Sequence, residues 1–172
     1  MNRLSTFALL TSALLLGFGL LAGDALAQQK LLKEQLVGTW KVVTSDNVTP
    51  EGAKRQTFGT NPKGVLILDA SGQYAQIIVR TDRPKFKVNN RLEGTAEENK
   101  AAVQGTTASF GTWSVDETSK SLIRRIEGSL FANQEGADQK TTIISLTADE
   151  LKISNPTPGA GGITENVFKR AK

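Results

Sequence analysis

The chain has 172 residues and a net charge of +4, with 21 basic and 17 acidic residues but no cysteine and no histidine. Without cysteine there are no disulfides, thiol nucleophiles or thiolate metal ligands, and without histidine the chain lacks the most common general base and metal ligand. The charges of both signs are interspersed, with no wide basic face or interleaved aromatic residues, so the sequence does not indicate nucleic-acid binding.

The first 27 residues have the three-part pattern of a secretory signal peptide. Arg3 precedes an apolar stretch from Phe7 to Leu21, and Ala25-Leu26-Ala27 offers small residues for a signal peptidase. A membrane-spanning helix needs roughly 20 apolar residues, and no stretch of the chain reaches that length. We therefore expect residues 28–172 to be exported as one domain without stable membrane insertion, to the periplasm in preference to full secretion; an uncleaved anchor is the alternative.

The remaining chain has the pattern of short strands with two helices. Thr95 is a candidate N-cap of the second helix, and the segment Asp46–Lys54, with Pro50 and Gly52, is predicted to be a loop. The predicted elements in chain order are a helix over 31–37, strands over 39–44, 65–68 and 73–80, a helix over 92–104, and strands over 108–115, 121–131, 140–146, 150–154 and 163–170.

Eight strands follow one another with few helices between them, which is typical of an antiparallel sheet that closes on itself. The long strand predicted over 121–131 favours a barrel over a flat sandwich. The sequence therefore predicts an all-β fold, an antiparallel eight-stranded barrel with a short N-terminal helix and one internal helix.

The start of the first strand resembles a known signature. Gly38-Thr39-Trp40 is similar to the Gly-x-Trp motif of lipocalins, and Arg170 matches the arginine that lipocalins place over that tryptophan. The chain resembles the bacterial lipocalin-like domain family from about Leu36 to Lys172. Further stretches that carry this resemblance are Phe58-Gly59, Pro62-Lys63-Gly64, Arg83-Pro84-Lys85-Phe86, 110–116, 127–131, 138–140, Leu151 and Gly161-Gly162.

The resemblance implies a lipocalin-like (calycin-type) barrel that is open at one end, with Gly38, Trp40 and Arg170 in structural roles. It implies little about the ligand. Members of the family often carry a histidine pair in the strand before the Glu-Gly-Ser segment, where this chain has Arg124 and Arg125. Any chemistry that depends on those histidines is therefore absent here.

Arg124 is the strongest candidate for a ligand contact. Side chains alternate along a strand, so Arg124 shares a mostly apolar face, predicted to point inward, with Leu122, Ile126, Gly128 and Leu130. An inward arginine needs a partner, which a carboxylate of the protein or of a ligand could provide. A frayed register would leave Arg124 outside, and a β-bulge would exchange the two faces.

Four other residues are candidate ligand contacts. The basic stretch from Arg80 through Arg83 and Phe86 to Lys87 either draws an anionic group to the barrel mouth or forms a solvated loop with Phe86 tucked against the barrel. Tyr74, the only tyrosine, either points its hydroxyl into a cavity or packs as an ordinary cross-strand aromatic.

We expect a protein that binds a small apolar or amphipathic molecule in a barrel cavity, without a metal or cofactor, and that is not an enzyme. One alternative is a barrel filled by side chains that works through its surface. A second is an isomerase or cyclase that acts on a lipid-like substrate without histidine. The oligomeric state is left open.

Overall fold

A computed structural model describes residues 31–159 and 161–172, and the predicted signal peptide lies outside these residues. No helix in this described part is long and apolar enough to cross a membrane. The elements are α1 (Leu32–Leu36), β1 (Gly38–Val48), β2 (Lys54–Gln56), β3 (Lys63–Leu68), β4 (Gln73–Val79), α2 (Ala96–Gln104), β5 (Thr106–Asp116), β6 (Ser121–Ser129), the short 3-10 turn η1 (Ala132–Gln134), β7 (Asp138–Leu146), β8 (Glu150–Asn155) and β9 (Ile163–Arg170).

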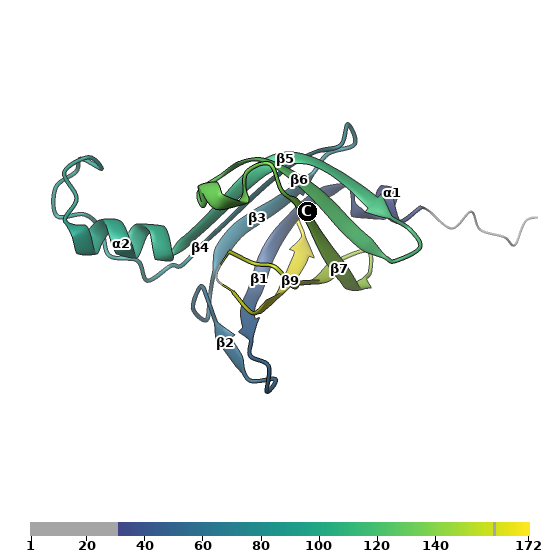
Figure 1. Ribbon diagram of the computed structural model, residues 1–172, viewed down its shortest axis with the longest axis horizontal. Helices are drawn as coiled ribbons and strands as arrows, with labels where there is room; N and C mark the ends of the chain where they lie inside the picture. The colour runs from purple at the N-terminus through teal and green to yellow at the C-terminus, as the bar shows by residue number, and fades with distance from the viewer. Residues whose placement is uncertain (1–30, 160) are drawn as a thin grey trace, which may run out of the picture. The chain divides into compact units, whose positions relative to one another are not determined.

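The strands form one antiparallel sheet that closes into a barrel (Figure 1). The order β1-β3-β4-β5-β6-β7-β8-β9 returns to β1, because β1 also pairs with β9 from Trp40 to Val48. The short strand β2 pairs only with the end of β1, at Asp46–Val48, and extends it as a hairpin. The predicted eight-stranded all-β barrel with two helices is therefore confirmed, and β2 is an addition to it.

One end of the barrel is closed by Trp40 and the residues around it. Leu36 and Trp40 are fully buried, and the indole Nε1 of Trp40 donates a hydrogen bond to the Leu36 carbonyl at 2.8 Å. The guanidinium of Arg170 lies 4.0 Å from the centre of the Trp40 ring, within the range of a cation–π contact. Arg170 also donates hydrogen bonds to the carbonyls of Gln35, Val37 and Ala148. Arg170 therefore joins α1, β9 and the β7–β8 turn over the tryptophan.

The inward side chains change from apolar to polar along several strands. On β9, Phe168 is followed toward the other end by Asn166 and Thr164, and all three are buried. The same change occurs from Leu122 to Arg124 on β6 and continues on neighbouring strands. Its other steps are Ile153 to Asn155 on β8, Ile143 to Thr141 and Gln139 on β7, and Tyr74 to Gln76 on β4. The apolar core thus occupies the closed half of the barrel, and the interior of the other half combines polar side chains with Phe58 and Ile78.

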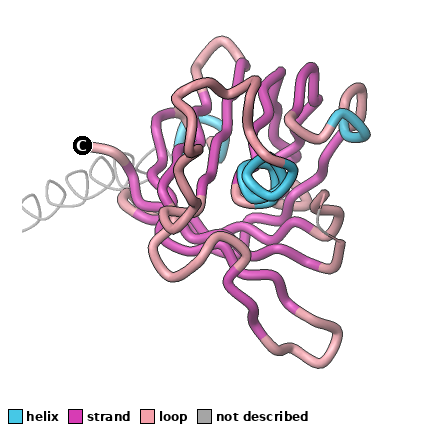
Figure 2. The backbone as a smooth tube through the Cα atoms, turned by 90° about the vertical axis from the view of Figure 1, so that its left-hand side faces the viewer, coloured by secondary structure: helices cyan, strands magenta, loops and turns pink. Residues whose placement is uncertain are grey.

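The other end of the barrel is open, and α2 stands outside it (Figures 1 and 2). Figure 2 shows α2 end-on in front of the ring of strands. No residue of α2 is buried, and its N-terminus is held by a capping box in which Thr95 and Glu98 bond to each other's backbone N–H groups. The helix begins at Ala96 and not at Leu92 as predicted, because Thr95 is the N-cap and ends the preceding turn.

The predicted loop over Asp46–Lys54 was wrong at both ends. β1 continues to Val48 and β2 begins at Lys54, so only 49–53 form the connection. A hydrogen bond of 2.9 Å from the Thr49 N–H to the Ala53 carbonyl closes this turn. Pro50 and Gly52 indicate the turn itself, but they do not show at which residues β1 ends and β2 begins.

A β-bulge lies between β5 and β6. Phe110 faces Gly128 and the next residue, Gly111, faces Ile126, so Glu127 is an extra residue on β6. The predicted inward face is therefore correct for Leu122, Arg124 and Ile126, which are buried. Beyond the bulge it is wrong for Gly128, which lies under the Phe110 ring. Leu130, which follows the end of β6, is half exposed at the rim of the barrel, where it lines the mouth of its cavity.

Candidate functional site

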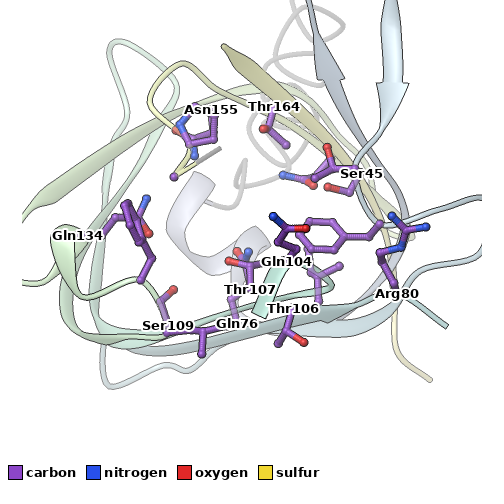
Figure 3. A pocket seen from close by; sticks show the side chains of 18 of the residues that line it. Ser45, Gln76, Arg80, Gln104, Thr106, Thr107, Ser109, Gln134, Asn155 and Thr164 are labelled. Atoms are coloured by element: carbon purple, nitrogen blue, oxygen red, sulfur yellow. The ribbon is translucent and has the colours of Figure 1, made fainter. Parts of the chain in front are cut away.

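The open half of the barrel contains a cavity of about 760 Å³. Polar side chains line it from opposite sides: Figure 3 shows Ser45, Asn155 and Thr164 on one side, with Gln76 and Ser109 on the other. Its apolar lining consists of Phe58 and Ile78 inside, with Val103, Leu130, Phe131 and Pro158 toward the mouth. The interior therefore offers many hydrogen-bonding groups beside a somewhat larger apolar surface.

Arg124 lies on the wall of this cavity and is only 3% exposed. β6 places it across from Trp113 of β5 and Gln139 of β7. Its guanidinium donates hydrogen bonds to the amide oxygens of Gln76 and Gln139, and more weakly to the Thr141 hydroxyl at 3.4 Å. Its Nε–H has no partner among the described residues.

The positive charge of Arg124 has no counter-charge in the described part of the chain. All its hydrogen-bond partners are neutral, and none of the ion pairs includes it. Burial lowers the pKa of Arg124, while the nearby Tyr74 partly raises it. An arginine nevertheless stays charged in a protein, so the cavity contains an unbalanced positive charge. Such a charge attracts an anion more strongly in a cavity than in water.

Tyr74 supports Arg124 from the closed half. Its ring centre lies 5.5 Å from the guanidinium carbon of Arg124, and its hydroxyl donates to the Ser109 hydroxyl at 3.3 Å. Tyr74 is 3% exposed and is not part of the cavity lining. Its position is that of a cross-strand aromatic which packs in the core and shields one side of the arginine.

Of the candidates in the basic stretch, only Arg80 lines the main cavity. It forms an ion pair with Asp82, with Nη2 and Oδ2 2.7 Å apart, and this hydrogen bond lowers the pKa of the Asp82 carboxyl. Arg83 lies beside Arg80 in a separate hollow and donates to the Arg80 carbonyl and the Thr106 hydroxyl. Phe86 packs against Gly94 in the segment that leads to α2. The structure therefore does not bring Arg83 and Phe86 together with Arg124.

Sequence reasoning missed the neutral partners of Arg124 and the polar residues opposite. Gln76 lies between the buried residues Tyr74 and Ile78 in the same strand phase, and Asn166 lies two residues before the buried Phe168. A polar residue in phase with apolar ones marks an inward polar group. That signal was present in the sequence for both residues. The part of the chain that the structure describes contains no group of three acidic side chains that could hold a metal ion.

Comparisons with known proteins identify the family of this chain. A family model described as a lipocalin-like domain matches residues 37–162. Similar solved structures are a lipocalin-like protein from Bacteroides uniformis (TM-score 0.45, 11% identity, 80% of this chain and 99% of that chain) and a mutant of the fluorescent protein UnaG (TM-score 0.36, 16% identity, 80% and 97%). No curated protein matches the sequence. Because the family model covers most of the sequence, this chain belongs to the lipocalin-like domain family.

Proposed function

We propose that this lipocalin-like protein binds a small amphipathic anion in its barrel cavity, with the negative group on Arg124. The observation that carries the proposal is a buried arginine without a carboxylate partner among the described residues, on the wall of a cavity of about 760 Å³. Sites for small molecules have volumes of roughly 300–1,000 Å³ and a few placed polar groups.

The surroundings of Arg124 suit a carboxylate. Gln76 and Gln139 hold the guanidinium from two sides through their amide oxygens, so its orientation is fixed before a ligand enters. A guanidinium presents its N–H groups in a planar fork that matches a carboxylate or phosphate, and such charge-assisted hydrogen bonds are the strong ones. An anion would also balance the charge, which is costly to bury alone.

The apolar lining supports an amphipathic ligand over a small inorganic ion. Phe58 and Ile78 are buried, while Leu130 and Phe131 are each 47% exposed at the mouth. An organic ligand that covers these side chains gains free energy from apolar burial in addition to its contact with Arg124. The proposed ligand is thus an organic anion with some apolar surface.

We further propose that the protein acts after export, in the periplasm or outside the cell. This part of the proposal rests on the sequence of residues 1–27 alone. Expression of the full chain in a bacterial host tests it directly. The expected product begins at Gln28 and is found in the periplasmic fraction; an unprocessed product that begins at Met1 and stays in the cytoplasm would contradict it.

Calorimetric titration of the purified product with matched ligands tests the anion site. Each carboxylate is compared with its neutral primary amide, for example dodecanoate with dodecanamide. We expect the acid to bind about 10–100-fold more tightly than the amide, because a charge-assisted hydrogen bond contributes about 1.5–3 kcal/mol. Arg124→Gln should remove this preference.

Arg125→Gln is the matched control. It removes the same charge from the next residue, whose side chain is 55% exposed on the outer face and pairs with Asp138. The control should bind as the unchanged protein does. Equal affinity for acid and amide, or unchanged acid binding by Arg124→Gln, would overturn the proposal.

A further inference from the structure

A second group of polar atoms in the cavity has no partner. The hydroxyl oxygens of Ser45 and Thr57 and the amide oxygen of Asn166 are buried and form no hydrogen bond with any described residue. All three residues line the cavity, and Ser45 and Asn166 are only 2% and 6% exposed. We refer to these three residues as the β1–β9 polar wall.

The β1–β9 polar wall is built by strand pairing. Ser45 of β1 lies directly opposite Asn166 of β9. The N–H of Thr57 donates to the Ser45 carbonyl at 3.1 Å, which holds Thr57 beside Ser45 just after β2. Thr164 and Asn155 continue the polar surface on β9 and β8, where they face each other. The unpartnered atoms therefore belong to one continuous patch on rigid strands.

This wall lies across the barrel from Arg124. In the ring of strands, β3, β4 and β5 separate β1 from β6 on one side, and β9, β8 and β7 separate them on the other. The strand that carries Ser45 is thus diametrically opposed to the strand that carries Arg124. In Figure 3, Ser45 and Thr164 lie across the cavity from Gln76, a partner of Arg124.

Buried polar atoms in folded proteins almost always have a hydrogen-bond partner. In a cavity such atoms are bonded by water or by the polar groups of a ligand that displaces it. The Asn166 oxygen only accepts, whereas the hydroxyls of Ser45 and Thr57 both donate and accept. A ligand hydroxyl can bond to all three, because it can donate to the Asn166 oxygen and can donate to or accept from the hydroxyls of Ser45 and Thr57. An alkyl chain would satisfy none and would leave them desolvated.

We infer that the cavity is built for a hydroxylated organic anion, with its acidic group on Arg124 and its alcohol groups on the β1–β9 polar wall. This inference rests on the proposed function and narrows its ligand class. It excludes simple fatty acids as the ligands that fit best, because their tails would cover the polar wall without bonding to it.

The test compares acids that differ by one hydroxyl group. The purified product of full-chain expression is titrated with dodecanoate and 12-hydroxydodecanoate. The corresponding decanoate and octanoate pairs are titrated as well, so that chain length is not limiting. We expect at least one hydroxylated acid to bind about tenfold or more tightly than its unmodified partner, because a site built to bond a hydroxyl disfavours the analogue that lacks it.

Variants of the β1–β9 polar wall test whether this wall causes the preference for the hydroxylated acid. Ser45→Ala and Asn166→Leu should each reduce the preference for the hydroxylated acid severalfold while the preference for acid over amide remains. Ser114→Ala, on the exposed face of β5, is the matched control and should change neither preference. Ser45→Ala removes only an unpartnered oxygen, so it should fold with an unchanged unfolding midpoint and keep the test valid if Asn166→Leu does not fold.

The outcomes distinguish the anion site of the proposed function from the hydroxyl-binding role of the β1–β9 polar wall. Equal binding of hydroxylated and plain acids, lost in Arg124→Gln, overturns the inference and leaves the anion site intact. A hydroxyl preference that survives both wall variants also overturns it. Failure of every acid to bind better than its amide overturns the proposed function, and the inference with it.

Discussion

Arg124 and Arg125 are neighbours in sequence with opposite surroundings. The side chain of Arg125 is exposed and pairs with Asp138, whereas Arg124 is buried among neutral groups. Strand alternation alone predicted this difference, because Arg124 is in phase with Leu122 and Ile126. The sequence could not show which residues surround the guanidinium, since Gln76 lies on a distant strand and Gln139 faces Arg124 only through the register between β6 and β7.

If the role of Arg124 is to bind a ligand, it should contribute little to the unfolding free energy of the ligand-free protein. Arg124→Met removes a buried charge that has no counter-charge among the described residues, and it keeps a side chain of similar length. We expect the free energy of unfolding, from urea titration of the ligand-free protein, to stay constant or rise by about 1 kcal/mol. A fall of more than about 2 kcal/mol would show instead that its hydrogen bonds stabilise the barrel.

Arg170 should behave in the opposite way. Arg170→Ala leaves the carbonyls of Val37 and Ala148 without this donor and removes the cation–π contact with Trp40. We expect a loss of about 2–3 kcal/mol in unfolding free energy, with ligand binding unchanged. Lys169→Ala, an exposed neighbour, is the control and should cost less than about 0.5 kcal/mol. Equal effects of the two substitutions would contradict the structural role.

At the scale of elements, the strands were largely predictable and their irregularities were not. The bulge opposite Gly111 moves Gly128 off the predicted inward face. The sequence near Glu127 does not predict that this residue is unpaired in a bulge, because a bulge depends on the register with the partner strand. The β1–β2 hairpin was missed for a similar reason, since strand β2 is only three residues long and fully exposed.

The bulge makes Gly111 irreplaceable. It has a φ of +155°, and a Cβ there would lie 2.1 Å from the Arg125 carbonyl oxygen. We expect Gly111→Ala to lower the unfolding free energy by about 3 kcal/mol or more, because the backbone of β6 must move. Gly136→Ala is the control. Gly136 has a φ of +77°, but a Cβ there would have no described atom within 4 Å beyond its chain neighbours. This substitution should therefore lower the unfolding free energy by only about 1–2 kcal/mol.

The β5–β6 turn should make stability depend on acid pH. Hydrogen bonds from Ser119, with a smaller contribution from Lys140, lower the pKa of Asp116 from 3.8 to about 2. A carboxyl group with a depressed pKa stabilises the fold above its unfolded pKa and loses that effect as pH falls from about 4 to about 2. Urea unfolding across this range should show a larger decline for the unchanged protein than for Asp116→Asn. Parallel declines would contradict this assignment.

At the scale of the whole molecule, the sequence predicted the barrel class but not the character of its interior. Alternating strands and the Gly38–Trp40 signature indicated a lipocalin-like barrel, which the family model and the closed sheet confirm. The sequence placed Arg124 on the inward face, but it did not indicate the unpartnered oxygens of Ser45 and Asn166 that share the cavity with it. The division into an apolar closed half and an open half with both polar and apolar lining arises only when all strands are placed side by side.

The central claim is that an organic anion occupies the cavity through Arg124. Its most direct test is negative-ion mass spectrometry of small molecules extracted from the protein purified from the cells that naturally produce it, beside the Arg124→Gln and Arg125→Gln variants made in the same cells. We predict one recurrent organic anion that copurifies with the unchanged protein and Arg125→Gln and is lost from Arg124→Gln. A neutral molecule, or the same anion retained in equal amount by Arg124→Gln, would contradict the claim.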